Sequence, residues 1–303
     1  CMALLDPENA NIQINIKSYG LYEIPVGTKA EELVEKIKHK LRYPVVAMII
    51  NNNLKDLHYR FTNSCELELV DLSYEIGLRI YRRSVAFILI KACRDLFPER
   101  RLVIKHSLSN GLLCEFAETG ISQEEVGQIE KRMQQIAAAD LPINKYTVLR
   151  EEACKIFSTQ EQTDKVKLLK FRDKSDVHVY SIAGFYEYFY GYMVPRTGMV
   201  NKFRVIKYPP GVILQTPQLN EPDKVQPYIE QRKLASIFSE AKDWADMLQT
   251  PHVAALNDTI GRGDINDIIR VNEALHEKKI ASIADQICQN EKVRLVLISG
   301  PSS

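Results

Sequence analysis

The sequence predicts an α+β protein with a small β-rich domain, a larger mixed domain and a helical connector. Short segments alternate apolar and polar residues, as at Ile12, Ile14 and Ile16, which is typical of strands with one buried face. Longer segments repeat apolar residues at helical spacing, most clearly after Ser73 and after Asp264. The length of 303 residues is enough for two or three domains with cores of their own.

The composition favours a soluble cytoplasmic protein. Lys and Arg number 40 against 39 Asp and Glu, so the bulk charge does not indicate a nucleic-acid partner, although local basic patches stay open. The six Cys form no C-x-x-C pair and no zinc-ribbon spacing, which suits reduced thiols and predicts no structural metal. No charged-then-apolar leader opens the chain, and no apolar run reaches membrane-spanning length, so we expect no membrane partner.

Residues 10–72 are predicted to form a compact β-grasp, or ubiquitin-like, domain. The strand at Ile12 to Ile16 is followed by Tyr19-Gly20 and a second strand, which makes a hairpin. Thr28 is expected to cap a helix that ends near Ile37. A strand at Val45 to Ile50 follows, and Phe61, Leu67 and Leu69 complete the core.

Residues 73–222 are predicted to form the larger α+β domain. A long helix begins after Ser73 and ends at Phe97-Pro98. A hairpin follows, with Asn110-Gly111 expected as its tight turn. Ser122 and Glu125 have the spacing of a capping box that opens a helix to about Ala138, and a further helix is expected at Arg150 to Phe157.

Residues 223–290 are predicted to be a helical connector, and residues 291–303 a strand running into a partial phosphate-binding loop. One helix is expected from Asp223 to Met247, with Ile229, Leu234 and Ile237 among its inward-facing residues. A second is expected from Asp264, as its cap, to Asn290. The run Val293 to Ile298 is almost entirely apolar, as in a strand covered on both faces.

Two parts of the chain resemble modules of aminoacyl-tRNA synthetases. The order of hairpin, helix, VVAMIINNNLKDL and CELELVDLSYEIGLRIYRRS over Asn11 to Leu72 resembles a TGS domain. The succession of YRRSVAFILIKACRDLFPERRLVIKHSLSNGLLCEF, LREEACKIF and YEYFYGYMVPRTG, over about Leu72 to Pro217, resembles the second, editing domain of threonyl-tRNA synthetase. The resemblance implies an α+β editing-like fold, which alanyl-tRNA synthetase shares.

In that editing family the working residues are an H-x-x-x-H pair on the first long helix and a C-x-x-x-H pair in a later loop. Aligned on these motifs, the chain has Arg83 and Phe87 at the two helix positions, and Phe189 and Met193 at the two loop positions. These side chains offer no strong zinc ligand and no general base near neutral pH. We therefore predict a degenerate editing site with no catalytic residue and no metal.

Other residues near these motifs are candidates for ligand or RNA contacts. Lys105 and His106 lie on the hairpin expected to border the cleft. The loop is dense in aromatic residues, of which Tyr190 and Tyr192 could stack on bases while Arg196 contacts phosphate. The alternative is that these aromatic residues fill the volume of the lost site.

The end of the chain resembles part of a nucleotide-binding motif. Gly300, Pro301, Ser302 and Ser303 match the start of G-x-x-x-x-G-K-[ST] but include neither its Lys nor the hydroxyl residue that follows it. The segments INDIIRVNEALHEKKIASIADQI and RLVLISGPSS resemble the connector in bacterial proteins where such modules precede a uridine kinase domain. This resemblance implies a C-terminal kinase domain on the same chain as the partner, with ATP and Mg²⁺ as cofactors of the intact protein and none in residues 1–303.

Three functional hypotheses follow. The first is a non-catalytic regulatory region that senses RNA or a nucleoside for an ATP-dependent uridine kinase. The second is a residual hydrolase of mischarged tRNA that works through rearranged residues such as His106. The third is a purely structural or oligomerising module, which a long helix with an apolar face would permit. The sequence does not separate the first from the third.

Overall fold

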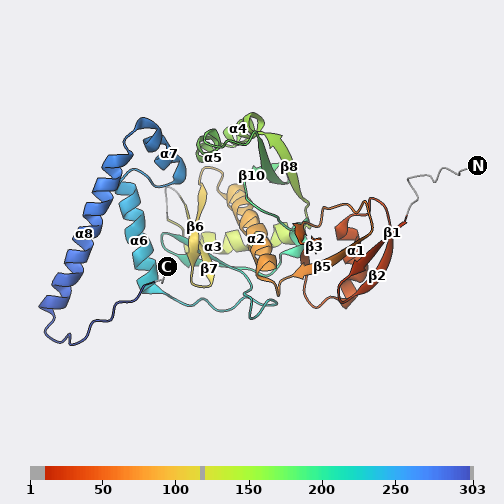
Figure 1. Ribbon diagram of the computed structural model, residues 1–303, viewed down its shortest axis with the longest axis horizontal. Coiled ribbons are helices and arrows are strands. Elements are labelled where there is room, and N and C mark those ends of the chain that lie inside the picture. The colour runs from red at the N-terminus through yellow and green to blue at the C-terminus, as the bar shows by residue number, and fades with distance from the viewer. Residues whose placement is uncertain (1–10, 117–119, 301–303) are drawn as a thin grey trace, which may run out of the picture. The chain divides into compact units, whose positions relative to one another are not determined.

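The protein has the α+β class expected from its sequence. A computed structural model describes residues 11–116 and 120–300, and Figure 1 shows its helices and strands. The chain divides into two compact units, one of Cys1–Val166 with Lys174–Leu234 and one of Lys167–Asp173 with Ala235–Ser303. The predicted domain boundaries after residues 72, 222 and 290 stay predictions.

The N-terminal part of the first unit is a five-stranded sheet with one helix. Its strands are β1 (Asn11–Ile16), β2 (Gly20–Pro25), β3 (Val45–Ile50), β4 (Asn53–Lys55) and β5 (Cys65–Asp71), in the order β2-β1-β5-β3-β4. The β1 and β5 strands are parallel, and the other neighbours are antiparallel. Exposed and buried residues alternate along β1, so Ile12, Ile14 and Ile16 point into the core with Phe61.

Helix α1 (Ala30–Ile37) is capped differently from the prediction. Its N-cap residue is Lys29, and no side chain caps the helix. The Thr28 hydroxyl instead donates to the carbonyl oxygen of Pro25 at 2.7 Å, which closes the turn that leaves β2. A Thr hydroxyl can either accept a hydrogen bond from a helix N–H or donate one to a nearby carbonyl. Here it donates to the carbonyl of the turn.

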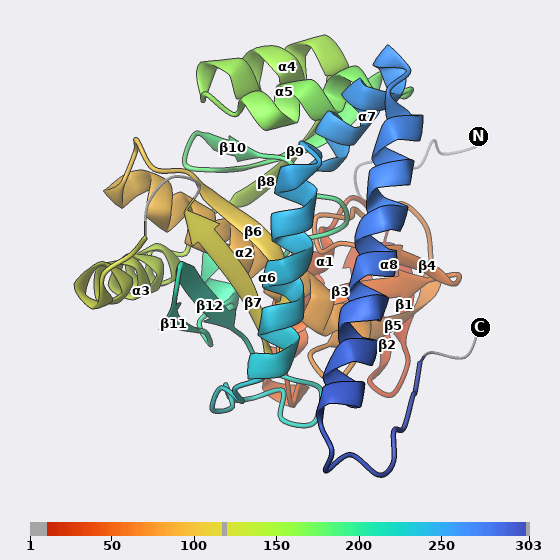
Figure 2. The same ribbon diagram turned by 90° about the vertical axis from the view of Figure 1, so that its left-hand side faces the viewer.

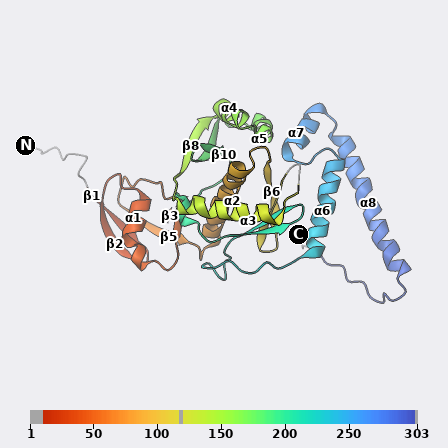
Figure 3. The same ribbon diagram turned by 180° about the vertical axis from the view of Figure 1, so that it is seen from behind.

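The rest of the first unit contains two further sheets. A four-stranded sheet has the order β11-β12-β7-β6, from β6 (Leu102–Leu108), β7 (Gly111–Phe116), β11 (Arg204–Tyr208) and β12 (Gly211–Gln215). Helices α2 (Glu75–Leu96) and α3 (Gln123–Ala138) pack against each other, as Figure 3 shows. The α3 helix begins with the predicted capping box, in which the Ser122 hydroxyl accepts from Glu125 N–H and the Glu125 carboxylate accepts from Ser122 N–H.

A three-stranded sheet carries the loop that contains two of the predicted site positions. Its order is β10-β9-β8, from β8 (Ile143–Leu149), β9 (Asp176–Ile182) and β10 (Phe185–Glu187). Helix α4 (Arg150–Thr159) packs on it, and α5 (Thr163–Lys170) comes next in the chain. The loop after β10 leads to a short 3₁₀ turn, η3 (Thr197–Met199).

The hairpin of β6 and β7 turns one residue earlier than predicted. Leu108 pairs with Gly111, so the two turn residues are Ser109 and Asn110, and Ser109 has a φ of 53°. Gly111 lies in β7 instead, where a Cβ atom would stand 2.3 Å from a side-chain carbon of Ile213. The glycine is therefore required for close packing of β7 on β12 and not for the turn.

The second unit consists mainly of helices. It contains most of α6 (Arg232–Met247) together with α7 (Val253–Arg262) and α8 (Ile265–Gln289). The Lys279 ammonium bonds the Glu240 carboxylate at 2.7 Å, which joins α8 to α6, and Figure 2 shows these two helices side by side. None of the helices in the described residues is long and apolar enough to cross a membrane.

Two predictions about the connector were wrong. Helix α6 begins at Arg232 and not at Asp223, because Pro227 has no N–H for a helix and disfavours helical geometry at the residue before it. Ile229 and Ile237, which were expected to face inward, are 60% and 62% exposed. Asp264 is the N-cap residue of α8 as predicted, but its side chain pairs with Arg262 and makes no cap bond.

The predicted strand at Val293 to Ile298 is not formed. Residues 293–300 have no regular secondary structure, and Ile298 is 94% exposed. A strand needs neighbours to satisfy its backbone N–H and C=O groups, and the described residues provide none here. Gly300 lies in this segment, while Pro301, Ser302 and Ser303 lie outside the described residues.

Candidate functional site

Two of the four predicted editing positions lie on helix α2. Arg83 and Phe87 are one turn apart, so their side chains lie on the same face of the helix. Phe87 is fully buried in the main core, whereas Arg83 is half-buried. The helix therefore presents a guanidinium and a phenyl ring where the resembling family has two imidazoles.

The loop after β10 brings the other two positions to this helix. The rings of Phe87 and Phe189 have centroids 5.6 Å apart and are tilted by 58°, and Phe185 lies 6.2 Å from Phe87. Met193 is only 2% exposed and belongs to the same core cluster. Tilted aromatic pairs at such distances are favourable, and the thioether adds apolar contact. Phe87 and Phe189 are thus in contact, and Met193 is buried in the same core; these three residues are called the apolar group.

Arg83 is held by the backbone of the same loop. Its Nη1 donates to the carbonyl oxygen of Tyr192 at 2.5 Å. Gly191 has a φ of 96°, and a Cβ atom there would stand 2.9 Å from the Arg83 guanidinium carbon. Burial lowers the pKa of the guanidinium, and Tyr180 acts against that shift. A guanidinium on a carbonyl positions the loop but offers no base.

Two more hydrogen bonds fix the loop to the elements beneath it. The Tyr180 hydroxyl of β9 donates to the Gly191 carbonyl at 2.7 Å. The Val194 N–H donates to the Ser84 hydroxyl at 3.0 Å, and that hydroxyl donates to the Ile80 carbonyl at 2.9 Å. Ser84 is fully buried, so water cannot reach its hydroxyl, and these two hydrogen bonds satisfy it. Helix α2 and strand β9 together determine the path of residues 191–194.

The side chains at these four positions are not themselves suited to hydrolysis. Neither a phenyl ring nor a thioether can take a proton from water near neutral pH, and the guanidinium stays protonated. Across residues 11–116 and 120–300, no group of three or more His, Cys, Asp or Glu could hold a metal ion. The arrangement supports packing and loop positioning, and the degenerate-site assignment itself stays a prediction.

His106 and Lys105 lie on β6 and not in this apolar group. His106 is half-buried, with Nδ1 3.0 Å from the carbonyl oxygen of Ser107. The Lys105 ammonium pairs with the Glu115 carboxylate of β7 at 3.7 Å.

The aromatic residues of the loop divide into buried and exposed members. Tyr190 is 88% exposed, the largest exposed fraction of any aromatic side chain among the described residues. Tyr192 is half-buried, and the Lys145 ammonium of β8 lies 4.8 Å from its ring centroid. A cation over an aromatic face is an attractive pair. One exposed tyrosine and one tyrosine with a neighbouring lysine thus form a small surface, the Tyr190 patch, defined here as Lys145, Tyr190 and Tyr192.

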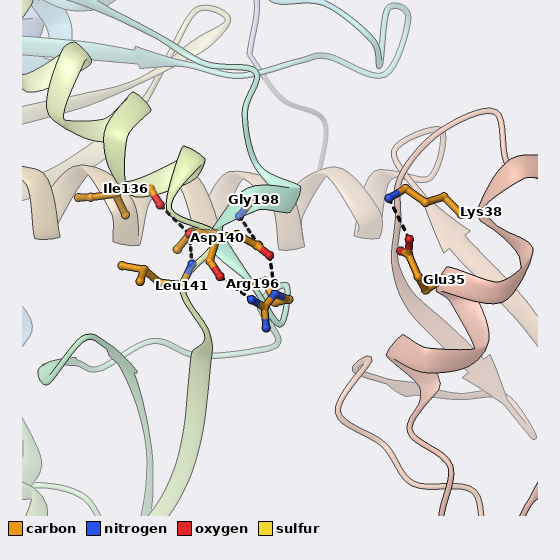
Figure 4. A network of polar contacts seen from close by, with 8 residues as sticks. Glu35, Lys38, Ile136, Asp140, Leu141, Arg196 and Gly198 are labelled. Carbon is orange, nitrogen blue, oxygen red and sulfur yellow. Dashed lines mark hydrogen bonds and ion pairs between the residues drawn. The ribbon is translucent and has the colours of Figure 1, made fainter.

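Arg196 forms an ion pair with Asp140, which lies just after the end of α3. Its Nε bonds the Asp140 carboxylate at 2.8 Å, and its Nη2 donates to the Asp140 carbonyl at 2.6 Å. Figure 4 shows this network, in which Asp140 also accepts from the Gly198 N–H at 3.1 Å. The Thr197 hydroxyl bridges the Ile136 carbonyl and the Leu141 N–H at 2.7 and 2.8 Å. Arg196 thus ties the loop to the end of α3, and its role in phosphate binding stays a prediction.

Sequence reasoning missed a buried ion pair beside the cleft. Glu187 of β10 is 2% exposed and pairs with the Lys165 ammonium of α5. The sequence does contain a signal for this ion pair: Glu187 is the one charged residue in the aromatic run from Phe185 to Tyr190. A lone charge among apolar residues is unusual, since buried charges are costly unless they are paired.

Comparison with known proteins agrees with part of this description. No protein-family model matches the chain. The chain is 29% identical over 197 residues to the threonine–tRNA ligase of Acetivibrio thermocellus, a match that covers 64% of the chain and 31% of that protein. The corresponding ligase of Desulforamulus reducens is 28% identical over the same length and coverage. That of Francisella tularensis subsp. novicida is 26% identical, with 65% of the chain and 31% of the protein covered.

These relatives support the resemblance to synthetases and do not bear on the resemblance to uridine kinases. The chain spans about a third of the length of the curated relatives it matches, 31% in each of the three described. The similarity supports the synthetase-like part of the resemblance, while the uridine kinase part, with its ATP and Mg²⁺, stays a prediction. Within those limits, the chain is similar to threonine–tRNA ligases over 197 of its residues.

Proposed function

We propose that this chain is an RNA-binding module of the synthetase type that does not hydrolyse aminoacyl-tRNA. The packed group of Phe87, Phe189 and Met193 carries the second half of the proposal, because it occupies the positions where acid–base or metal-ligating residues would act. The tRNA partner is suggested by the relatives, which are named as threonine–tRNA ligases.

The Tyr190 patch supports the RNA-binding half. A protruding ring gives a base a surface on which to stack, and each such stack contributes about 1–3 kcal/mol in single-strand binding proteins. The ammonium of Lys145 lies over the ring of Tyr192, two residues further along the loop, and adds a positive charge for the phosphate backbone. Since the net charge of the chain is only +1, the affinity should depend on such local groups.

Binding and hydrolysis can be tested separately on the 303-residue chain. Fluorescence anisotropy with an uncharged threonine tRNA transcript measures binding, and release of labelled serine from seryl-tRNA measures hydrolysis. We expect saturable binding that weakens with salt, and no deacylation above the rate in buffer. Deacylation by the purified chain would refute the loss of hydrolysis, and failure to bind tRNA at low salt would refute the RNA-binding half.

Variants locate the RNA contact. Tyr190→Ala should weaken binding by about 1–3 kcal/mol, whereas Tyr190→Phe should retain most of it, because stacking needs only the ring. Lys145→Ala should reduce the salt dependence, since one phosphate contact is lost. Lys36→Ala is the charge-matched control, because Lys36 is exposed on α1. Equal effects of the Lys145 and Lys36 substitutions would place the RNA elsewhere.

A further inference from the structure

Three arginines lie close together near the start of helix α2. Arg82 and Arg83 are three and four residues after Arg79, so each lies one helical turn from it. Arg79 is exposed, whereas Arg82 and Arg83 are half-buried. Like charges at these spacings repel each other and lower the stability of a helix. An arrangement of this kind therefore favours the binding of an anion.

The described residues supply a single carboxylate to these three guanidinium groups. Glu75 pairs with Arg79 at 2.5 Å. Arg83 donates to the backbone carbonyl of Tyr192, and Arg82 forms no hydrogen bond or ion pair with any described residue. Three positive charges against one negative charge leave an excess of two on this part of α2.

Arg82 is the least compensated of the three. The residues one turn before and after it on the helix are all buried, with exposed fractions of 5% or less: Leu78, Val85 and Ala86. Burial lowers the pKa of the Arg82 guanidinium, Arg79 lowers it too, and Glu75 acts against both. A half-buried charge without a counterion is unfavourable, because water solvates it only in part. A bound anion would offset that cost.

The guanidinium groups of Arg82 and Arg83 are nevertheless open to solvent. Among the described residues, five buried side-chain nitrogen or oxygen atoms have no hydrogen-bond partner, and none of the five belongs to either arginine. Since Arg82 makes no bond within the described chain, its nitrogens must retain contact with solvent. The same holds for the nitrogens of Arg83 that do not bond Tyr192. A ligand can therefore reach both groups.

Phosphate is the anion that these groups suit. A guanidinium presents its N–H donors in a planar fork, which matches two oxygens of a phosphate group. The loop indicates the source of the phosphate, because Arg83 bonds the backbone of Tyr192, a member of the Tyr190 patch. The surface for stacking bases and the uncompensated positive charge thus meet at one residue.

We propose that Arg82 and Arg83, with Arg79 beside them, bind backbone phosphate of the RNA whose bases stack on the Tyr190 patch. This inference rests on the proposed function and assigns the phosphate contact to helix α2. Arg82 is the residue on which to test it, since Arg83 also positions the loop and Arg79 is paired with Glu75.

Fluorescence anisotropy with the uncharged threonine tRNA transcript, over a range of salt concentrations, tests the site on the 303-residue chain. Arg82→Met removes the charge and keeps an unbranched side chain. We expect it to weaken binding about tenfold at low salt and to reduce the slope of log K against log salt by about 0.7–0.9, the value for one phosphate contact. Arg82→Lys should weaken binding less and keep the slope, because the charge remains. Arg270→Ala, at an exposed position of α8, is the control and should change neither.

Stability separates a role in RNA binding from a role in the fold. Without RNA, Arg82→Met should raise the midpoint of urea denaturation or leave it unchanged, because it removes a half-buried charge that repels Arg79. An arginine that supports the fold would lower the midpoint when replaced. Weaker tRNA binding together with a lower midpoint would therefore assign Arg82 to the fold and overturn the proposal.

The outcomes for this site and for the proposed function are distinct. A wild-type chain that does not bind tRNA would refute the RNA-binding function and the site with it. A wild-type chain that binds tRNA, with the same affinity and salt slope for Arg82→Met as for Arg270→Ala, would refute the site alone. Inorganic phosphate, titrated by calorimetry at constant ionic strength, should bind far more weakly than tRNA. Phosphate binding as tight as that of tRNA would overturn the assignment to an RNA backbone.

Discussion

The ring of Phe87 on α2 packs against the ring of Phe189 in the loop after β10, with 5.6 Å between their centroids. This contact joins the first long helix to a segment far along the chain. It occupies the place where the resembling editing domains have an imidazole and a thiol, so the loop is positioned by apolar packing in place of polar groups around a substrate. The stability of the unit should depend on it.

Phe87→Ala should lower the free energy of unfolding of the first unit by about 3–5 kcal/mol, because Phe87 is fully buried and a cavity would remain. Urea denaturation followed by far-ultraviolet circular dichroism measures this change. Fluorescence of the single tryptophan is unsuitable, because Trp244 lies in α6 of the other unit. Tyr190→Ala is the control and should stay within about 0.5 kcal/mol. Comparable losses for both variants would contradict the packing described for Phe87.

Gly191→Ala should destabilise the first unit by about 1–3 kcal/mol. The residue has a φ of 96°, which L side chains rarely adopt, and its new methyl group would meet the Arg83 guanidinium. Repeating the substitution in an Arg83→Ala background should reduce the loss, because the clash is removed while the backbone strain persists. Gly127→Ala in exposed α3 is the matched control, and its Cβ would meet nothing within 4 Å. It should stabilise the protein by roughly 0.5–1 kcal/mol, and a stabilising effect at Gly191 would be inconsistent with the loop geometry.

Thr197→Val should cost about 1–3 kcal/mol, because the buried Leu141 N–H and Ile136 carbonyl would lose their shared hydroxyl partner. Thr197→Ser keeps that hydroxyl and should cost less. Arg196→Ala removes an ion pair and a backbone hydrogen bond, both to Asp140 and both at the surface, so its effect should be below about 1 kcal/mol. Chemical denaturation of the three variants ranks their losses in free energy of unfolding. A larger loss for Arg196→Ala than for Thr197→Val would contradict our interpretation of Figure 4.

Glu187 predicts a particular pH dependence of stability. Burial raises the pKa of its carboxyl, so the folded state binds this proton more tightly than the unfolded state does. The contribution is fully present below the unfolded pKa and declines as the pH rises from there through the folded pKa. Glu187→Gln cannot titrate, so its stability relative to the wild type should rise over that interval. Denaturation curves at a series of pH values test this, and a difference that is constant or falls with pH would show that Glu187 is not the group responsible.

The fold was predicted best where the signal is local. Alternation at Ile12, Ile14 and Ile16 reports one buried face of a strand, and Ser122 with Glu125 forms a cap from residues three apart. The errors arose where a distant partner decides. Gly111 was assigned to a turn because its contact with Ile213 of β12 cannot be read from neighbouring residues. The apolar run at Val293 to Ile298 indicates a strand only if other strands are available to pair with it.

The candidate site was likewise predicted where a local motif marks it and missed where distant segments meet. Motif alignment identified Phe87, Phe189 and Met193, and the structure buries Phe87 and Met193 in one core cluster and packs Phe189 against it. It did not indicate that the Arg83 guanidinium would bond the Tyr192 carbonyl, since a backbone acceptor has no sequence signature. The ion pair of Glu187 with Lys165 was missed because its members come from separate elements, β10 and α5. Only the isolated charge of Glu187 among aromatic residues pointed to it.

The bond from the Val194 N–H to Ser84 has a consequence for amide hydrogen exchange. Val194 and Ser84 are both fully buried, and the acceptor is anchored in the middle of α2. Loop amides normally exchange through small local openings, whereas this one can be released only when the loop leaves the helix. Its protection factor should therefore match those of the α2 amides and far exceed that of Tyr190. Residue 194 would then act as a loop reporter for the opening of the whole unit.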